Sequence, residues 1–297
     1  MSAPDRAVAA APVRLPEWAR KSGLLARGAR DVRVLLRSGA LHTVCEEARC
    51  PNLGECFTRG TATFLLLGDR CTRRCGYCSV STARPLPPDP GEPERVAEAA
   101  RRMGLRYVVL TSVDRDDLRD GGAAHFAATV QAVRRALPEA RVEVLTPDFK
   151  GGEDALRAVL EARPDVFNHN IETVPRLFPR LRPQGRYRLS LDVLAAARAI
   201  RPRQTTKSGL MVGLGETDEE VLAVLADLRG AGVDVVTIGQ YLRPTRAHEP
   251  VHRYVPPEGF GALEERARAL GFPTVYSGVF VRSSFNAEEL YRAGGAR

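Results

Sequence analysis

The sequence predicts an α/β fold, a partial (β/α)6 barrel of the TIM type with one extension before it and another after it. Short apolar runs typical of buried strands alternate with longer helical segments in one continuing series. This alternation favours a parallel sheet with right-handed crossovers. Because no GxGxxG motif follows the first strand, the six strand-helix units indicate a curved or partial barrel rather than an open doubly wound sheet.

The first barrel strand is expected at 62–68, where the apolar run ATFLLLG is closed by Gly68 and Asp69. The strands that follow are expected at 106–111, 141–146, 166–173, 205–214, 234–240 and 273–279. The helices between them are expected at 92–103, 122–137, 153–163, 188–201, 217–231 and 258–271. We therefore divide the chain into an amino-terminal extension at 1–60, the barrel at 61–272 and a carboxyl-terminal segment at 273–297.

The composition is that of an ordinary globular protein, since 44% of the 297 residues are apolar and 27% are charged. No apolar run approaches the ~18 residues needed to cross a bilayer, and the early segment AVAAAPV is short and broken by Pro12. We expect neither a membrane span nor a secretion signal, and we predict a cytoplasmic protein.

The formal charge of +8, with a pI near 9.5, would permit an acidic partner such as nucleic acid. Of the 44 basic residues only Lys21, Lys150 and Lys207 are lysines, and the arginines are spread along the chain. The chain has no basic block and no interleaving of aromatic with basic residues of the kind found in nucleic-acid-binding modules. We therefore expect no nucleic acid among its ligands.

The six cysteines all lie between positions 45 and 78, and they form two triplets with different spacings. The first triplet, C-x4-C-x5-C, is Cys45, Cys50 and Cys56, and the second, C-x3-C-x2-C, is Cys71, Cys75 and Cys78. A disulfide framework suits small secreted proteins rather than a long chain that can build its own core. Structural zinc needs four ligands, commonly divided two and two, so a division into three and three does not suit it.

Three thiolates on a short loop suit an iron-sulfur cubane in which the protein holds three irons and the fourth iron stays open for chemistry. Two cubanes need eight ligands and the chain has six cysteines, so at least two positions must be filled by other groups or by substrate. This arithmetic argues against a ferredoxin, which saturates its clusters with cysteines. The second triplet directly follows the strand at 62–68, at the carboxyl end, where barrels carry out their chemistry.

Polar residues gather at the carboxyl ends of the other predicted strands, although each alone could be a cap or a turn. Lysine is rare here, so finding two at strand ends suggests that a point-charge amine is wanted there. A period of two places Asn170 and Glu172 on one strand face, with His169 opposite as a packed residue rather than a ligand. The set comprises Asp114 to Asp117, Asp148, Lys150, Asn168, Asn170, Glu172 and Lys207.

Together these motifs resemble those of the lipoyl synthases, a family within the radical S-adenosylmethionine enzymes. The resemblance covers about residues 14–290. It is carried by C-x3-C-x-aromatic-C at 71–78 and by the segments CEEARCPNLGECF, TSVDRDDLRDGG, NHNIET, TKSGLMVGLGE and RSSF. The paired cysteine triplets are very specific, whereas the glycine-rich pieces alone would be weak.

The resemblance implies an enzyme that inserts two sulfur atoms into an octanoyl chain carried on a lysine of a carrier protein. The 4Fe-4S cluster on Cys71, Cys75 and Cys78 would bind the amino and carboxylate groups of S-adenosylmethionine at its open iron, and one electron would break the sulfonium bond. A 5′-deoxyadenosyl radical would then take hydrogen from C6 and C8 of the chain. Aliphatic C–H bonds have no acidity that a side-chain base could use, so radical chemistry supplied by a cofactor suits this substrate.

By the same resemblance the second 4Fe-4S cluster, on Cys45, Cys50 and Cys56, is sacrificed as the sulfur donor. Ser284, the second serine of RSSF, would be its fourth protein ligand. Serine holds iron in a thiolate cluster more weakly than cysteine does, which suits a bond that is meant to break. The chain departs from the family at Phe285, where tyrosine is usual.

For contacts with S-adenosylmethionine we expect Tyr77 near the adenine, Asn170 and Glu172 beside the amino group or a ribose hydroxyl, and Lys207 at a strand end. Arg282 would supply positive charge near the anionic second cluster.

The resemblance also implies partners. They are an octanoylated lipoyl carrier domain of a 2-oxoacid dehydrogenase E2 component or a glycine cleavage H protein, an electron donor such as flavodoxin or ferredoxin, and an iron-sulfur carrier that rebuilds the second cluster. Two alternatives stay open. Another two-cluster radical enzyme, of the methylthiotransferase or biotin synthase type, would share the barrel but not the upstream triplet or RSSF. A non-enzymatic iron-sulfur or zinc protein would leave the polar strand ends without a role.

Overall fold

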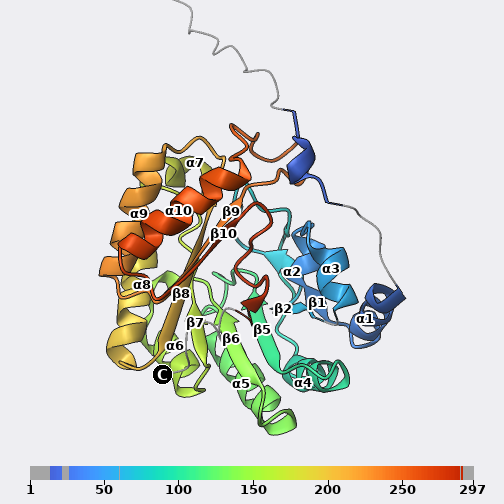
Figure 1. Ribbon diagram of the computed structural model, residues 1–297. Coiled ribbons are helices and arrows are strands. Elements are labelled where there is room, and N and C mark those ends of the chain that lie inside the picture. Colours follow the sequence, from blue (N-terminus) through green and yellow to red (C-terminus); the bar gives the residue numbers. More distant parts are fainter. Residues whose placement is uncertain (1–13, 22–26, 60, 288, 290–297) are drawn as a thin grey trace, which may run out of the picture.

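An eight-stranded sheet forms the centre of the protein in the computed structural model, which describes residues 14–21, 27–59, 61–287 and 289 (Figure 1). Neighbouring strands are parallel except β1 and β2, and their order is β1-β2-β5-β6-β7-β8-β9-β10. Two short strands, β3 (Arg70–Cys71) and β4 (Ser81–Thr82), pair separately. The sheet strands are β1 (His42–Thr43), β2 (Thr63–Leu66), β5 (Tyr107–Ser112), β6 (Arg141–Leu145), β7 (Val166–Asn168), β8 (Thr205–Val212), β9 (Val235–Gln240) and β10 (Thr274–Gly278).

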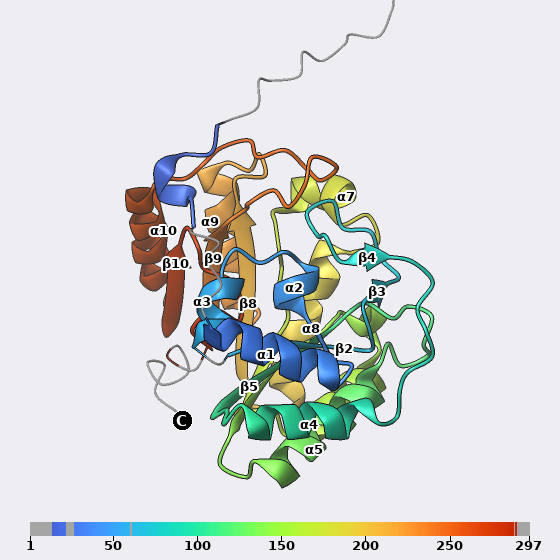
Figure 2. The same ribbon diagram turned by 90° about the vertical axis from the view of Figure 1, so that its right-hand side faces the viewer.

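Helices cover the outside of this curved sheet (Figures 1 and 2). From β2 to β10, one long helix lies between each parallel strand and the next. Because the strands are covered on both faces, their side chains are buried almost without interruption. The predicted partial barrel of six strand-helix units is confirmed. Its helices are α4 (Glu92–Arg102), α5 (Ala123–Ala136), α6 (Glu153–Glu161), α8 (Tyr187–Ile200), α9 (Asp218–Gly230) and α10 (Pro257–Ala269).

One strand is shorter than the sequence predicts. β7 ends at Asn168, whereas the apolar pattern predicts a strand over 166–173. Glu172 has a left-handed backbone, with φ of 69°, which a strand cannot include. The chain there is held to β8 instead, since Glu172 N donates to Gly209 O at 2.9 Å and Met211 N donates to Glu172 O at 2.9 Å. Placing Asn170 and Glu172 on one face of a strand is therefore wrong, and any contact between them comes from this turn.

β8 also ends before the predicted boundary at 214. Gly213 and Gly215 have φ of 101° and 105°, a conformation that glycine adopts without strain. The buried carboxylate of Glu216 accepts hydrogen bonds from the backbone N of Gly213 at 2.6 Å and of Leu214 at 2.8 Å. The strand therefore stops at Val212 and gives way to a glycine-rich turn at the carboxyl end of the barrel.

A small helical layer precedes the barrel and lies beside β2, where β1 pairs with the sheet (Figure 2). It contains α1 (Arg27–Ser38), α2 (Val44–Glu47) and α3 (Leu53–Thr58). Thr43 caps α2 by accepting a hydrogen bond from the backbone N of Glu46. The remaining short elements are η1 (Glu17–Ala19), η2 (Phe149–Gly151), η3 (Pro175–Leu177) and α7 (Phe178–Leu181).

At the other end of the chain, β10 adds to β9 as the last strand of the sheet. The chain after Gly278 returns toward the amino-terminal layer, where Asn52 Nδ2 donates to Phe280 O at 2.7 Å. The chain after β10 therefore lies against the amino-terminal layer beside the barrel. The division into three parts at 60/61 and 272/273 stays a prediction.

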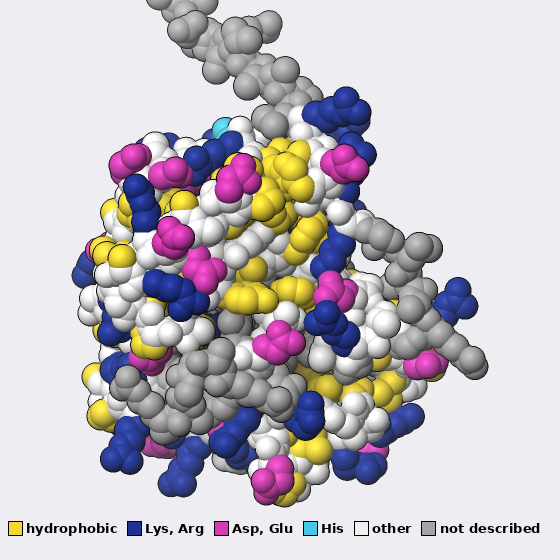
Figure 3. All heavy atoms as spheres, viewed as in Figure 1, with side chains coloured by type: hydrophobic (Ala, Val, Ile, Leu, Met, Phe, Trp, Pro, Cys, Tyr) yellow, Lys and Arg dark blue, Asp and Glu magenta, His cyan; other side chains and the backbone are white. Residues whose placement is uncertain are grey.

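No helix in the described ranges is long and apolar enough to cross a membrane. On the face drawn in Figure 3, Lys and Arg side chains alternate with Asp and Glu side chains and do not gather in one basic patch. The surface on that face therefore matches the even spread of arginine along the sequence.

Candidate active site

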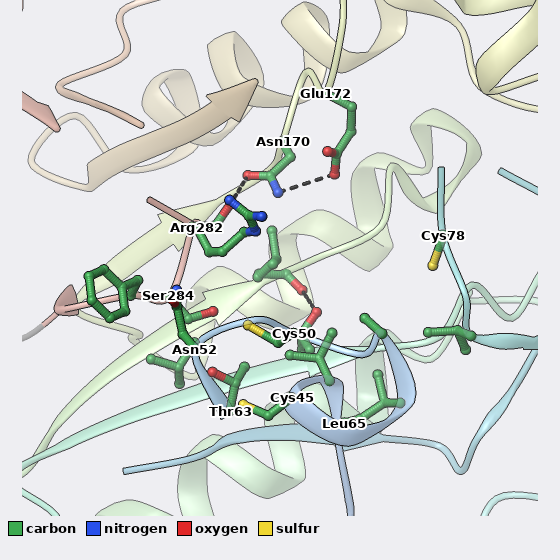
Figure 4. A pocket seen from close by; sticks show the side chains of 18 of the residues that line it. Cys45, Cys50, Asn52, Thr63, Leu65, Cys78, Asn170, Glu172, Arg282 and Ser284 are labelled. Atoms are coloured by element: carbon green, nitrogen blue, oxygen red, sulfur yellow. Dashed lines mark hydrogen bonds between the residues drawn. The ribbon is translucent and has the colours of Figure 1, made fainter. Parts of the chain in front are cut away.

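A cavity of about 550 Å³ lies at the carboxyl ends of the barrel strands, and all six cysteines line it. This volume falls within the ~300–1,000 Å³ that is usual for sites of small ligands and cofactors. Its walls come from the loops around α2 and α3, from the barrel strands and from the chain at 282–287 and 289. In Figure 4, Cys45 and Cys50 lie on the same side as Ser284, whereas Cys78 lies apart from them. The two triplets therefore face one cavity from different sides.

The second triplet lies on the loop that begins at β3. Cys71 ends β3, and Cys75 and Cys78 follow in the next turns. The backbone of this loop is bound to its surroundings, since Thr72 N donates to Asp114 O at 3.0 Å and Gly76 N donates to Leu181 O at 2.8 Å. The loop is thus fixed at both ends to the barrel.

Arg73 anchors the middle of the same loop. Its side chain is only 4% exposed, and its guanidinium forms two paired sets of hydrogen bonds, with Asp116 at 2.8 and 2.9 Å and with Asp148 at 2.7 and 2.8 Å. Burial would raise the pKa of Asp148, but the hydrogen bonds and charge of Arg73 lower it to about 2. The loop is therefore joined by a buried ionic network to the loops that follow β5 and β6.

Burial raises the pKa of Cys45 and Cys56 in the first triplet and of all three thiols in the second, to about 11 for Cys56 and about 12 for Cys78. Neighbouring thiols of the same triplet add to this effect, since Cys50 raises the pKa of Cys45 and Cys56, and Cys75 raises that of Cys78. The cysteines therefore form two separate groups. Because metal ligation needs the thiolate, a positively charged iron centre would have to replace these protons.

Several buried side chains surround the second triplet. Asn170 Nδ2 donates to Glu172 Oε1 at 3.1 Å (Figure 4), and burial raises the pKa of Glu172 against the opposing charge of Arg182. Burial lowers the pKa of Arg182, but the nearby Tyr77, Glu172 and Cys75 outweigh this and raise it. Sequence reasoning missed Arg182, because it follows the short helix α7 in a loop that no motif marks.

The first triplet lies in the helical layer, with Cys45 in α2, Cys56 in α3 and Cys50 between the two helices. The chain at 280–287 lies over this layer. It is held there by Asn52, described above, and by Arg59, whose Nη1 donates to Asn286 Oδ1 at 3.3 Å.

Six residues of this carboxyl-terminal chain, 282–287, line the cavity. Arg282 and Ser284 lie near Cys50 (Figure 4). Burial lowers the pKa of Arg282, and the charge of Cys50 opposes that shift. Ser283 points elsewhere, because its Oγ donates to Asn170 Oδ1 at 2.8 Å.

The donor set fits two iron-sulfur clusters better than a simple metal ion. Among the described residues, no three His, Cys, Asp or Glu side chains lie close enough together to hold one metal ion. A cubane makes a different demand, because its thiolates bind separate irons around it. Within the described residues, the buried hydroxyls of Ser112 and Thr146 line the cavity and have no hydrogen-bond partner. Such hydroxyls suit a cavity that receives a polar ligand.

Lys207 lies elsewhere than the sequence analysis expects. It is the third residue of β8 rather than a residue at the strand end, and it does not line the cavity. Its buried ammonium binds Glu143 at 2.9 and 3.1 Å, and Glu143 also accepts from Asn168 Nδ2 at 2.9 Å. The expectation of Lys207 at a strand end is therefore wrong, and we no longer assign it to the cofactor site.

Two other polar residues have structural partners. His169 is 1% exposed, with Nδ1 2.8 Å from Thr146 O and Nε2 3.1 Å from Ser190 Oγ, and burial lowers its pKa to about 4. It is packed against both partners, as predicted, and it also borders the cavity. Lys150 does follow its strand, but its exposed ammonium donates to Asp116 O at 2.8 Å and does not line the cavity.

The comparisons with known proteins agree on one superfamily. The family model of the radical SAM superfamily matches residues 65–228. The lipoyl synthase of Methylococcus capsulatus is 58% identical over 94% of this chain and 87% of its own length. That of Rubrobacter xylanophilus is 54% identical over 92% of this chain and 85% of its own.

Two solved structures share the fold at low sequence identity. The [FeFe]-hydrogenase maturase HydG is 14% identical, with a TM-score of 0.57, and the match covers 90% of this chain and 70% of that one. Methylornithine synthase is 16% identical, with a TM-score of 0.52, and the match covers 88% of this chain and 85% of that one. These likenesses support the partial barrel and carry no statement about substrates.

Proposed function

Because this chain belongs to the lipoyl synthase family of the radical S-adenosylmethionine superfamily, we propose that it inserts sulfur at C6 and C8 of an octanoyl chain on a carrier protein. Membership of the family makes it an enzyme that uses S-adenosylmethionine and a 4Fe-4S cluster. The second cluster and the sulfur insertion are the proposal. One observation carries them, namely two separate groups of three thiols in a single cavity.

We assign S-adenosylmethionine and its cluster to the side of the cavity that holds the second triplet. When bound, they supply the organic radical that removes hydrogen from an unactivated C–H bond. The Glu172 carboxylate suits the amino group or a ribose hydroxyl of S-adenosylmethionine, and the Arg182 guanidinium offsets the negative charge of thiolates and carboxylates in this buried position. Tyr77 offers a buried aromatic face to the adenine.

We assign the second cluster to Cys45, Cys50 and Cys56, with Ser284 as the fourth ligand. The position of Ser284 in the cavity beside Cys50 supports this assignment (Figure 4). Arg282 is half-buried beside Cys50 and would compensate for part of the negative charge of such a cluster. A cluster that is taken apart to supply sulfur cannot also deliver electrons repeatedly, so two separate thiol groups suit two separate tasks.

The acyl chain needs an apolar environment, and the barrel offers one. Side chains from four strands line the cavity, namely Leu65, Val109, Leu145 and Met211. An apolar wall binds hydrocarbon and keeps water away from a radical. The protein itself therefore contributes to the reaction by orienting the octanoyl group and by excluding solvent.

The partners follow from the proposed reaction. The substrate would be an octanoylated lipoyl carrier domain of a 2-oxoacid dehydrogenase E2 component or a glycine cleavage H protein. An electron donor such as flavodoxin or ferredoxin would reduce the first cluster, and an iron-sulfur carrier would rebuild the second. The cytoplasmic location stays a prediction.

The test uses anaerobically reconstituted protein. We expect about eight irons and eight sulfides per chain, which corresponds to two cubanes. With S-adenosylmethionine, a reductant and an octanoylated lysyl peptide, mass spectrometry should detect a peptide that has gained two sulfurs, together with 5′-deoxyadenosine. An iron content near four, or a peptide without sulfur despite 5′-deoxyadenosine formation, would contradict the proposal.

A further inference from the structure

A chain of hydrogen bonds crosses the cavity from the carboxyl-terminal segment to the barrel. Ser283 Oγ donates to Asn170 Oδ1 at 2.8 Å, and Asn170 Nδ2 donates to Glu172 Oε1 at 3.1 Å (Figure 4). All three residues line the cavity. Ser283 is the neighbour of Ser284, the proposed ligand of the second cluster, whereas Glu172 belongs to the proposed S-adenosylmethionine site. The bonds therefore link the two halves of the site directly.

The backbone around Asn170 is fixed, so that only its side chain is free to respond. Ile171 N donates to Ser208 Oγ at 3.1 Å, and Glu172 is held to β8 by its N and its O, as described above. Gly209 makes room for the chain of bonds, because a Cβ there would lie 2.9 Å from Ser283 Oγ and 3.0 Å from Asn170 Oδ1. A side chain at Gly209 would thus meet both partners of the first bond.

The two ends of the Asn170 amide have opposite character, because Oδ1 accepts hydrogen bonds and Nδ2 donates them. With Nδ2 on the Glu172 carboxylate, Oδ1 faces Ser283 and accepts a hydrogen bond from its hydroxyl. If the amide group flipped, its Oδ1 would face the carboxylate oxygen of Glu172, and two hydrogen-bond acceptors would oppose each other. The hydroxyl of Ser283 therefore stabilises the one amide orientation that also binds Glu172.

The carboxyl-terminal segment is able to transmit this effect, because it also contacts the other side of the site. Phe280 O accepts from Asn52, and the ammonium of Lys21 lies 4.9 Å from the Phe280 ring and 5.1 Å from the Phe285 ring. The same short segment thus contacts Asn52, which lies between Cys50 and Cys56 in the sequence, and is linked to Glu172 through Ser283 and Asn170.

We propose that Ser283 and Asn170 couple the binding of S-adenosylmethionine at Glu172 to the position of the segment that carries Ser284. Ser283 is a positioning residue, which acts through Asn170. The coupling rests on the proposed function, since it takes Glu172 as a contact of S-adenosylmethionine and Ser284 as a cluster ligand. Displacement of the segment, when the second cluster gives up its serine ligand, then weakens S-adenosylmethionine binding. By reciprocity, S-adenosylmethionine binding holds the segment in place.

The test is a double-mutant cycle on the affinity for S-adenosylmethionine, measured by calorimetry on protein reconstituted with both clusters. Loss of this half-buried hydrogen bond should raise Kd about 2- to 10-fold in Ser283→Ala. Asn170→Ala should raise it at least as much, and the double variant should not exceed Asn170→Ala. Ser277→Ala, which loses a hydrogen bond to Phe260 O outside the cavity, is the matched control and should leave Kd unchanged.

A second readout follows from reciprocity. Addition of S-adenosylmethionine should slow amide hydrogen exchange at residues 279–287 in the unsubstituted protein and much less in Asn170→Ala. This measurement does not depend on catalytic activity. It also covers the case in which Ser283→Ala folds poorly, because Asn170→Ala breaks the same chain of bonds from the other side.

The outcomes separate the coupling from the proposed function. If Glu172→Gln weakens S-adenosylmethionine binding but Ser283→Ala does not, the coupling is wrong and the assignment of Glu172 stands. If the effects of Ser283→Ala and Asn170→Ala simply add, the two residues act independently and the coupling is again wrong. If the unsubstituted protein does not bind S-adenosylmethionine, the proposed function fails and the coupling fails with it.

Discussion

The two cysteine triplets face one cavity, but the protein holds them in different ways. The loop of the second triplet is fixed to the barrel by backbone hydrogen bonds and by the buried network of Arg73 with Asp116 and Asp148. The first triplet lies on α2 and α3, helices of four and six residues, under a terminal segment held by Asn52 and Arg59. The thiols proposed for the cluster that persists therefore lie on a loop that a buried ionic network holds in place. Those proposed for the sacrificed cluster lie on short helices under a terminal segment that Asn52 and Arg59 hold by side-chain hydrogen bonds.

The largest effect on stability should come from breaking the ionic network of Arg73, which holds the loop of the second triplet. Arg73→Met takes away the guanidinium that binds Asp116 and the fully buried carboxylate of Asp148, and loss of one member of a buried ion pair costs about 3–5 kcal/mol. We expect a fall of that size in the free energy of unfolding of the metal-free protein, measured in urea.

The control for this variant is Arg268→Met, which removes an exposed pair with Glu264 four residues earlier on α10. It should cost less than about 1 kcal/mol. Equal losses in the two variants would show that the Arg73 network does not hold its loop, and the contrast between the triplets would lose its basis.

A smaller effect is expected from acid. The pKa of Asp148 is lowered from 3.8 to about 2 in the folded protein, so its contribution is fully present above pH ~4 and is lost as the pH falls through 2. The free energy of unfolding should therefore fall by roughly 2 kcal/mol over this window from this residue. Urea titrations of the metal-free protein between pH 5 and pH 2 measure it. Asp148→Asn should flatten that part of the profile, and an unchanged profile would count against the network.

The smallest effect on global stability is expected at the first triplet, where Asn52 holds the terminal segment. Asn52→Ala removes hydrogen bonds to Phe280 O at 2.7 Å and from Lys21 Nζ at 2.6 Å, and should cost about 1–3 kcal/mol, felt locally. We expect faster amide exchange at 279–287 and faster loss to a chelator of the iron bound by the first triplet.

Ser38→Ala is the control in the same helical layer, because it loses an exposed hydrogen bond to Leu35 O at 2.8 Å that does not involve the terminal segment. Its exchange and chelation rates should stay close to those of the unsubstituted protein. If Asn52→Ala instead released iron from both triplets at the same rate, the two regions would not differ in the way that we describe.

Much of the fold and the grouping of the cysteines into two triplets could be predicted from the sequence, because both depend on spacing along the chain. Apolar runs and cysteine spacings are local features, and the structure brings each triplet together where its loop lies. The end of β7 could not be predicted, since it depends on the left-handed turn at Glu172 and its bridge to β8. Nothing in the pattern of residues 166–173 encodes that bridge.

The roles of the charged residues could not be predicted from the sequence as readily, because they depend on partners that are distant along the chain. Lys207 binds Glu143, 64 positions away, and so lies inside the barrel rather than at its rim. Arg73 and Arg182 are two of many arginines, and only the tertiary structure shows that they are buried beside the second triplet. Ser283 and Asn170, 113 positions apart, meet for the same reason.

The central claim is that the two triplets have separate tasks, and one pair of variants tests it most directly. Both variants are assayed for 5′-deoxyadenosine and for sulfur-containing octanoyl peptide. Alanine at Cys71, Cys75 and Cys78 should abolish 5′-deoxyadenosine formation and therefore all product. Alanine at Cys45, Cys50 and Cys56 should leave 5′-deoxyadenosine formation in place and remove sulfur insertion. Two-sulfur product from the second variant, or 5′-deoxyadenosine from the first, would contradict the account.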